Sequence, residues 1–380
     1  MTTPTGPGGD AALHRRAAAT VSDANPADVA RLQCLSAYPM VSVLMATSPG
    51  SGLAPAEERK LERLITQAEG RLEAEMGRES GPIGNALRSL AEEVAQSPTA
   101  HGLALFAGAG VLEAYRLPLT PRDREVIDPT FATRDLHRAV LENPPYRILV
   151  LAAGTARLFV GTGRELRPRS TQELPIEATR ADVADRRGHL HQADRGGGKL
   201  QRLDSFLRQA DRALDADPTS RDLPMVVAAA EPLASRYRRR SSHQIVGVVA
   251  GNHERSSAAR LAQLARPVID QHLKEERDSA RAQLERAVGG GRSVSGIDGV
   301  WRAAQHGRIM LLLVDPTYAY PATVDADGRS LTPSEDPTHP SVLDDAVDEV
   351  IEAAALRGGS ICFTPLDPDH GGIAAILSTT

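Results

Sequence analysis

A glycine-rich segment near the middle of the sequence has the residue types that could approach a phosphate backbone. Glycine adopts positive φ angles and lets another chain come close. Flanking cations make positioning contacts with phosphates, which fix register without reading bases. The residues concerned are Arg195, Gly196, Gly197, Gly198, Lys199, Gln201 and Arg202. Two interpretations stay open, a loop that inserts into RNA and a flexible surface loop.

The same segment does not fit a nucleotide-binding P-loop. That motif requires Gly-x4-Gly-Lys-Ser/Thr, in which the final hydroxyl holds Mg²⁺. Here Ala193 stands at the first glycine position and Leu200 replaces the hydroxyl residue. We therefore expect no bound nucleotide at this segment, and nothing else in the sequence indicates a cofactor.

The densest run of positive charge is Arg236-Tyr237-Arg238-Arg239-Arg240. Cations at the C-terminal end of a helix interact favourably with its dipole, so a solvated helix end is one interpretation. The other is a phosphate-contacting patch formed by Arg236, Arg238, Arg239 and Arg240, with Tyr237 available to stack on a base. The residue types alone do not decide between the two.

Residues that bind metals or act as nucleophiles form no recognisable site. His189 and His191, near Asp185 and Asp194, would need a further ligand in a fixed geometry, so we expect solvated histidines instead of a metal centre. The two cysteines form no CxxC pair, and no Gly-x-Ser-x-Gly elbow occurs. We therefore expect neither a metal nor a catalytic residue.

Charge is distributed unevenly along the chain. The whole sequence has 44 Lys+Arg and 49 Asp+Glu, a net charge of −5. Residues 1–143 have 14 basic and 18 acidic residues, residues 144–290 have 25 and 18, and residues 291–380 have 5 and 13. A +7 segment thus lies between segments of −4 and −8, which points to a polyanionic partner for the middle. The alternative is that an arginine-rich composition places these charges on solvated helix faces.

Apolar patterns predict an α/β protein of three domains, each a mixed sheet with packed helices. Buried runs predict strands at 40–46, 146–152, 245–249 and 308–315, and helical spacing predicts helices at 53–76, 200–214, 256–288 and 342–356. Prolines at 144–145 and glycines at 289–291 mark boundaries. The predicted parts are a disordered leader at 1–30, an N-terminal domain at 31–143, a basic middle domain at 144–290 and an acidic C-terminal domain at 291–380.

No apolar run approaches the about 18 residues of a membrane span. Residues 1–28 lack the apolar core of a signal peptide. We therefore expect a cytoplasmic protein with no membrane partner.

The order of these features resembles the bacterial archaeo-eukaryotic release-factor family, whose relatives include Pelota and Balon. The resemblance covers roughly residues 35–380 and is carried by Tyr38–Leu44, Gly102–Phe106, Tyr115–Pro118, Arg147–Leu151 with Ala156–Phe159, Gly299–Val314 and Gly371–Leu377. It implies a ribonuclease-H-like middle domain and a C-terminal domain similar to kink-turn-binding ribosomal proteins.

The middle-domain loop departs from the family's pattern. True release factors carry Gly-Gly-Gln before a helix, and the glutamine enters the peptidyl-transferase centre. Here Lys199 follows Gly198, and Gln201 lies two residues further on. This departure speaks against peptide-release chemistry, whereas a glycine-rich cationic loop still suits contact with RNA phosphates.

The resemblance implies a ribosome-binding translation factor of the release-factor or Pelota type. We expect it to be non-catalytic, to occupy the A site in ribosome hibernation or rescue, and to contact rRNA. A translational GTPase is a further expected partner, and DNA is not. One alternative is a peptidyl-tRNA hydrolase or peptide chain release factor that uses the glycine-rich loop. Another is a metal-dependent nuclease, although the middle strands offer no evident carboxylate cluster.

Overall fold

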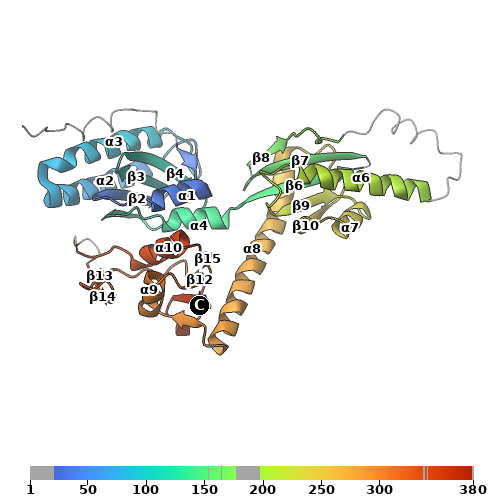
Figure 1. The fold of residues 1–380 in the computed structure, drawn as a ribbon. Coiled ribbons are helices and arrows are strands. Elements are labelled where there is room, and N and C mark those ends of the chain that lie inside the picture. Colours follow the sequence, from blue (N-terminus) through green and yellow to red (C-terminus); the bar gives the residue numbers. More distant parts are fainter. Residues whose placement is uncertain are drawn as a thin grey trace, which may run out of the picture. The chain divides into compact units, whose positions relative to one another are not determined.

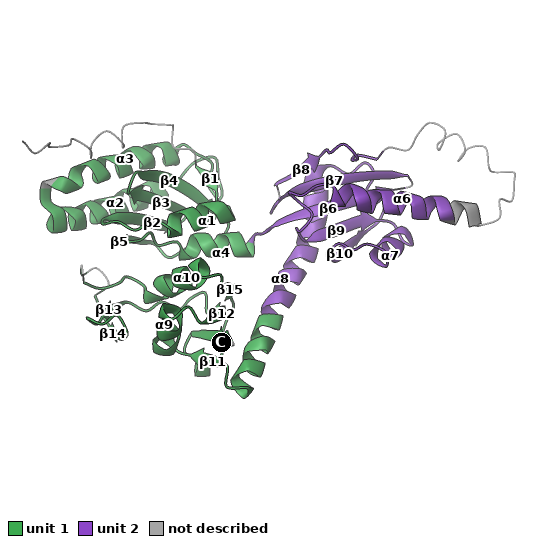
Figure 2. Ribbon diagram, in the orientation of Figure 1, with its two compact units in different colours: residues 1–142, 279–380 green, residues 143–278 purple. Residues whose placement is uncertain are grey.

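The computed structural model describes residues 21–152, 154–163, 165–176, 197–336, 339 and 341–378. The chain folds into mixed sheets with packed helices (Figure 1), which confirms the predicted α/β class. It divides into two compact units, a flanking unit of residues 1–142 with 279–380 and a middle unit of residues 143–278 (Figure 2). The three domain boundaries, the ribonuclease-H likeness and the kink-turn-binding likeness stay predictions.

The N-terminal lobe of the flanking unit, residues 21–142, is a five-stranded sheet in the order β1-β4-β3-β2-β5. Only β1 and β4 run parallel, and the other neighbours are antiparallel. The strands are β1 (Ser22–Asp23), β2 (Met40–Ala46), β3 (Gly102–Gly108), β4 (Val111–Leu117) and β5 (Arg124–Asp128). The helices are α1 (Pro26–Gln33), α2 (Pro55–Met76), the 3-10 helix η1 (Gly77–Ser80), α3 (Gly81–Ala95) and α4 (Arg134–Glu142).

Both faces of this sheet are covered, which explains the continuous apolar run of β2. Alternate residues of a strand point to opposite faces. Val41 and Val43 therefore join one core with α2 and α3, while Met40 and Leu44 join another with α1 and α4. The strand predicted at 40–46 is confirmed.

Helix α1 shows that the predicted disordered leader extends too far. The side-chain oxygen of Asn25 accepts hydrogen bonds from the backbone amides of Ala27 and Asp28, at 2.9 and 3.1 Å, and so caps the helix. Val29 and Leu32 are buried against the sheet. Residues 26–30 therefore belong to the folded lobe.

The C-terminal lobe of the flanking unit, residues 291–378, has a four-stranded sheet in the order β11-β16-β12-β15 and a separate β13-β14 pair. Its strands are β11 (Ser293–Ser295), β12 (Ile309–Val314), β13 (Ala322–Val324), β14 (Leu331–Pro333), β15 (Ser360–Phe363) and β16 (Ile373–Leu377). Its helices are α9 (Ile297–Gln305), α10 (Ala346–Leu356) and the 3-10 helix η2 (Pro368–His370). Strand β12 is parallel to β15 and antiparallel to β16.

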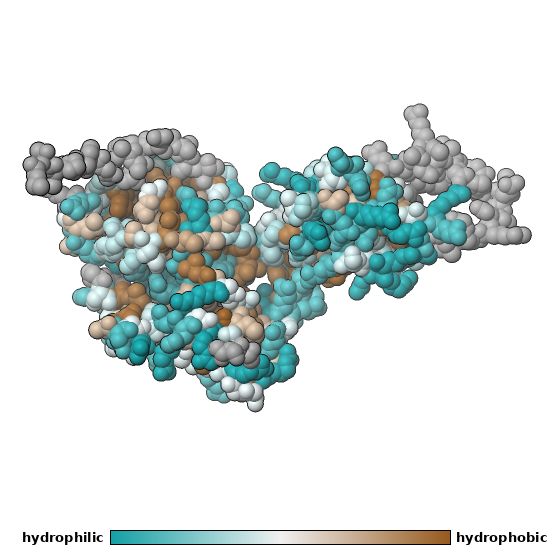
Figure 3. All heavy atoms as spheres, viewed as in Figure 1, coloured by the Kyte–Doolittle hydropathy of each residue, from teal (hydrophilic) through white to brown (hydrophobic). Residues whose placement is uncertain are grey.

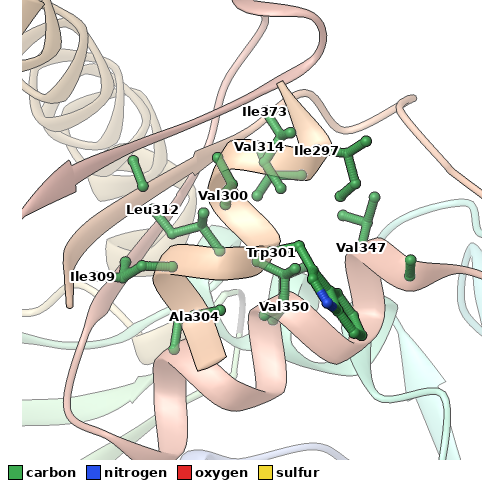
Figure 4. Close-up of a cluster of buried hydrophobic side chains, with 14 of the residues drawn as sticks. Ile297, Val300, Trp301, Ala304, Ile309, Leu312, Val314, Val347, Val350 and Ile373 are labelled. Atoms are coloured by element: carbon green, nitrogen blue, oxygen red, sulfur yellow. The ribbon is translucent and has the colours of Figure 1, made fainter. Parts of the chain in front are cut away.

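Trp301, the single tryptophan of the chain, lies in the core of this lobe between α9 and α10 (Figure 4). Val300 of α9 and Val350 of α10 belong to the same core. The indole Nε1 donates a 2.9 Å hydrogen bond to the backbone oxygen of Gly328. The tryptophan is therefore a local probe of whether this lobe is folded.

The middle unit is built on a five-stranded sheet in the order β10-β9-β6-β7-β8. Strands β10, β9 and β6 are parallel neighbours, and β6, β7 and β8 form an antiparallel meander. The strands are β6 (Pro145–Ala152), β7 (Thr155–Thr162), β8 (Glu165–Arg169), β9 (Met225–Ala229) and β10 (Ile245–Ala250). The helices are α6 (Gly197–Asp215), α7 (Leu233–Arg238) and α8 (Ala258–Gly289), whose end belongs to the flanking unit.

Helices cover both faces of the middle sheet. Leu149 of β6 shares a core with Leu207 of α6 and with α7, while Ile148 shares another with Leu261 of α8. Beyond the middle unit, the end of α8 packs on the C-terminal sheet through Leu284. In the described part of the chain, no helix is both long enough and apolar enough to cross a membrane.

Candidate nucleic-acid interface

The glycine-rich segment leads into α6. Arg195 and Gly196 lie outside the described residues, as do the residues 185–194 considered as metal ligands. The helix begins at Gly197, so Gly197, Gly198 and Lys199 lie in its first turn. The part of the predicted loop that the structure describes is therefore helical.

Gln201 and Arg202 follow in the same helix, and both residues are exposed. An exposed polar side chain near a helix N-terminus can reach an approaching ligand without displacing packed atoms.

Among the residues that the structure describes, no group of three or more His, Cys, Asp or Glu side chains is arranged to hold a metal ion.

The arginine run at α7 separates into two pairs. Arg236 donates from Nε to Oδ1 of Asp204 at 2.7 Å, and Nη1 of Arg240 lies 2.6 Å from the same oxygen. Asp204 belongs to α6, so these two arginines tie α7 and its C-terminal end to the neighbouring helix. Their hydrogen bonds lower the pKa of the Asp204 carboxyl to about 2. Arg236 and Arg240 therefore have a structural partner within the chain.

Arg238 and Arg239 form the other pair. Both are exposed, at the last residue of α7 and at its C-cap. Within the described ranges of the chain, neither side chain has an ion-pair or hydrogen-bond partner. These two guanidinium groups are therefore available to an external anion.

Tyr237 does not take the role that the sequence suggested. Its residue is only 1 % exposed, and its hydroxyl donates to Oδ1 of Asp211 at 2.9 Å. Ser241 donates to the same oxygen at 2.6 Å. Burial raises the pKa of the Tyr237 hydroxyl. The interpretation in which this ring stacks on a base does not hold, because the ring belongs to the buried core between the helices and the sheet.

The surroundings of the exposed pair are basic. Residues 143–278 contain 23 Lys+Arg and 17 Asp+Glu, a net charge of +6. Arg208 and Arg212 of α6 and Arg255 of the loop before α8 are also exposed. The face of the middle unit visible in Figure 3 is mostly hydrophilic around α6 and α7. The unit therefore offers a cationic surface suited to a polyanion.

Sequence reasoning missed Asp204 as a determinant of this surface. Asp204 is 32 positions from Arg236 in the chain, and no local spacing rule connects the two. A basic run of four arginines predicts four equivalent cations, whereas one carboxylate engages two of them. Only the packing of α7 beside α6 separates the structural arginines from the available ones.

Comparisons with known proteins agree with the sequence resemblance. Residues 145–308 match the model of bacterial archaeo-eukaryotic release factor family 3. No curated protein matches the chain in sequence.

Among solved structures, Archaeoglobus fulgidus Pelota is 14 % identical, with 93 % of this chain and 92 % of that chain covered and a TM-score of 0.32. A model of ribosome-bound archaeal Pelota and ABCE1 is 12 % identical, with 94 % and 95 % covered and a TM-score of 0.39. Saccharomyces cerevisiae Dom34, described as a translation termination-like factor that interacts with Hbs1, is 11 % identical, with 74 % and 73 % covered and a TM-score of 0.36. The match over residues 145–308 shows that this segment of the chain is similar to the bacterial archaeo-eukaryotic release-factor family.

Proposed function

We propose that this protein is a ribosome-binding translation factor of the release-factor or Pelota type, which contacts rRNA phosphates through its middle unit. The observation that carries the proposal is the exposed pair Arg238 and Arg239, which has no partner among the described residues and lies in the segment that matches the family. In our proposal the protein occupies the A site without catalysing hydrolysis, in hibernation or rescue.

The chemistry of the surface favours positioning over sequence reading. Exposed arginines that lie on a helix end contact phosphates and fix orientation, while base recognition needs side chains that reach base edges. Tyr237 is buried and cannot stack on RNA. We therefore expect binding that depends strongly on salt and weakly on RNA sequence.

We also propose a protein partner of the translational-GTPase class. The motivation is the net charge of −8 in residues 291–380, together with the family's association with translation. A basic surface on such a partner would complement exposed carboxylates such as Asp327 and Asp369.

Cosedimentation with purified 70S ribosomes tests the proposal. The protein is expected to pellet with ribosomes at moderate salt, either alone or with a delivering elongation factor. Absence of binding under both conditions would overturn it. A parallel sedimentation at high salt, which strips bound factor from the ribosomes, serves as the control for protein that is merely trapped in the pellet.

The alternative function, peptidyl-tRNA hydrolysis or peptide release, is favoured by the exposure of Gln201, which lies three residues after Gly198. A release assay on stalled ribosomes separates the two functions. Wild-type protein and Gln201→Ala are expected to give the same background, with Gln209→Ala, another exposed glutamine of α6, as the matched control. Release that is lost only in Gln201→Ala would establish the hydrolase.

A further inference from the structure

Arg124 of β5 reaches from the N-terminal lobe into carboxylates of the C-terminal lobe. Its Nη1 donates to Oδ2 of Asp344 at 3.1 Å, and its Nη2 donates to Oδ2 of Asp348 at 3.2 Å. Asp135 of α4 lies 3.7 Å from the same guanidinium. The side chains of all four residues are between 13 and 18 % exposed. One arginine thus joins segments more than two hundred positions apart in the chain.

A second arginine makes a parallel connection. Arg134 donates from Nη1 to Oδ2 of Asp345 at 2.8 Å and from Nη2 to the backbone oxygens of Asp315 and Pro316, at 3.1 and 3.2 Å. The other oxygen of Asp345 accepts from the backbone amide of Val347 and so caps α10. The side chain of Asp345 is only 1 % exposed. The contact therefore engages the start of α10 itself.

Polar contacts, not a shared apolar core, connect the two lobes. The N-terminal lobe has its own cores on either side of its sheet, and the C-terminal lobe has a core around Trp301 and another against the end of α8. Among the described residues, no core cluster contains side chains from both lobes. Thr130 adds one more polar bond, donating from Oγ1 to Oε1 of Glu349 at 2.9 Å.

We propose that Arg124, Arg134 and the carboxylates that they contact form an electrostatic latch, which holds the two lobes in one arrangement and can open without unfolding either lobe. The inference is independent of ribosome binding. It also means that Asp344, Asp345 and Asp348 serve an internal contact, so they are not part of the acidic surface offered to a partner while the latch is closed.

The physics of buried ion pairs supports a device of this kind. Taking charges out of water costs free energy that their attraction only partly offsets, so such contacts fix geometry more than they add stability. On opening, the arginines and aspartates regain favourable hydration. Exposing an apolar core to water would instead cost free energy. The closed arrangement is therefore specific and reversible.

Hydrogen exchange of the full-length chain tests the latch. Arg124→Met keeps side-chain length and removes the charge. We expect amides of β5, of α4 and of the first turn of α10 to exchange at least tenfold faster than in wild type, while the fluorescence of Trp301 stays native. Arg116→Met is the matched control, because Arg116 pairs with Asp23 inside the N-terminal lobe at 2.9 Å.

Two results would overturn the latch. Unchanged exchange at β5, α4 and α10 in Arg124→Met would mean that the arginine does not hold the lobes together. Loss of the native Trp301 signal in soluble Arg124→Met would mean that the lobes are one folding unit. If Arg124→Met does not fold, Arg124→Lys is used in its place. Lysine keeps the positive charge but lacks the planar guanidinium that donates to two carboxylates at once. The latch again requires faster exchange at β5, α4 and α10 with native Trp301 fluorescence.

Discussion

Replacement of Arg238 and Arg239 by alanine should weaken ribosome binding and flatten its dependence on salt. Both guanidinium groups are exposed and have no partner in the described part of the chain, so their removal leaves no buried carboxylate unpaired. Exposed substitutions of this kind change stability by less than about 0.5 kcal/mol. Any loss of binding can therefore be assigned to lost contacts with the ribosome.

The expected size follows from counterion release. Each phosphate contact contributes about −0.9 to the slope of log K against log salt concentration, so two lost contacts reduce the slope by about 1.8. Between about 50 and 200 mM salt, wild type should then lose about twelvefold more affinity than the double variant. Titration of labelled protein with 70S ribosomes over this salt range measures both slopes.

Two comparisons make the test decisive. Arg59→Ala with Arg63→Ala removes two exposed arginines from α2 of the flanking unit and should leave the slope unchanged. Arg236→Ala should chiefly loosen α7, because it removes a bond to Asp204. Equal slopes for wild type and Arg238→Ala/Arg239→Ala would refute the assignment of this surface to RNA contact.

Three further predictions concern the loop, the flanking unit and the middle unit. Arg195→Glu with Lys199→Glu should weaken ribosome binding and lower its salt slope, and unchanged affinity and slope would mean that this segment does not touch phosphate. Burial, and then repulsion from Glu349 and Asp348, raises the pKa of Glu352 to about 8, and burial raises the pKa of Asp128 to about 7. Because these groups bind protons more tightly when folded, stability should fall by about 1–3 kcal/mol as pH rises from 6 to 9. Urea unfolding followed by Trp301 fluorescence measures this fall in the free energy of unfolding. Glu352→Gln should make the fall smaller, while the exposed Glu58→Gln should leave it unchanged. A free energy of unfolding that rises with pH would contradict the prediction. Asp217→Ala should destabilise the middle unit by about 2–3 kcal/mol, since the 2 % exposed Asp217 accepts hydrogen bonds from Arg169 and Ser220. Calorimetry should show a lower Tm for it but not for exposed Asp222→Ala, and equal Tm values would contradict the role of Asp217.

Sequence pattern predicted the helices and strands whose buried face is specified by their own residues. Strand β2 has a continuous apolar run because helices cover both faces of its sheet, and α6 (Gly197–Asp215) contains the helix that apolar spacing predicts at 200–214. Such elements need no knowledge of distant partners, since their own residues specify which face is buried.

The same pattern rules could not predict elements whose charged residues pair with residues far away in the sequence. Strand β5 has the sequence Arg-Glu-Val-Ile-Asp, whose charges are typical of a loop, yet Arg124 is balanced by Asp344 and Asp348. Helix α4 begins at Arg134, whose charge is paired with Asp345. A sequence scan counts these charges as solvated, because their partners are fixed only once the two lobes meet.

The sequence pointed to a basic middle segment but not to which of its arginines are exposed and unpaired in the described part of the chain. The middle segment was identified by its net positive charge, and the arginine run by its density. Which arginines are available depends on Asp204, and Tyr237 is unavailable because its ring is buried. Both depend on how α7 packs against α6, which no spacing in the sequence encodes.

A cryo-EM map of the protein bound to a 70S ribosome tests the central proposal most directly. We expect density for the middle unit in the A site, with Arg238 and Arg239 within contact distance of rRNA phosphates. A map in which the protein binds the ribosome only through its flanking unit, with these two arginines facing solvent, would contradict the proposal.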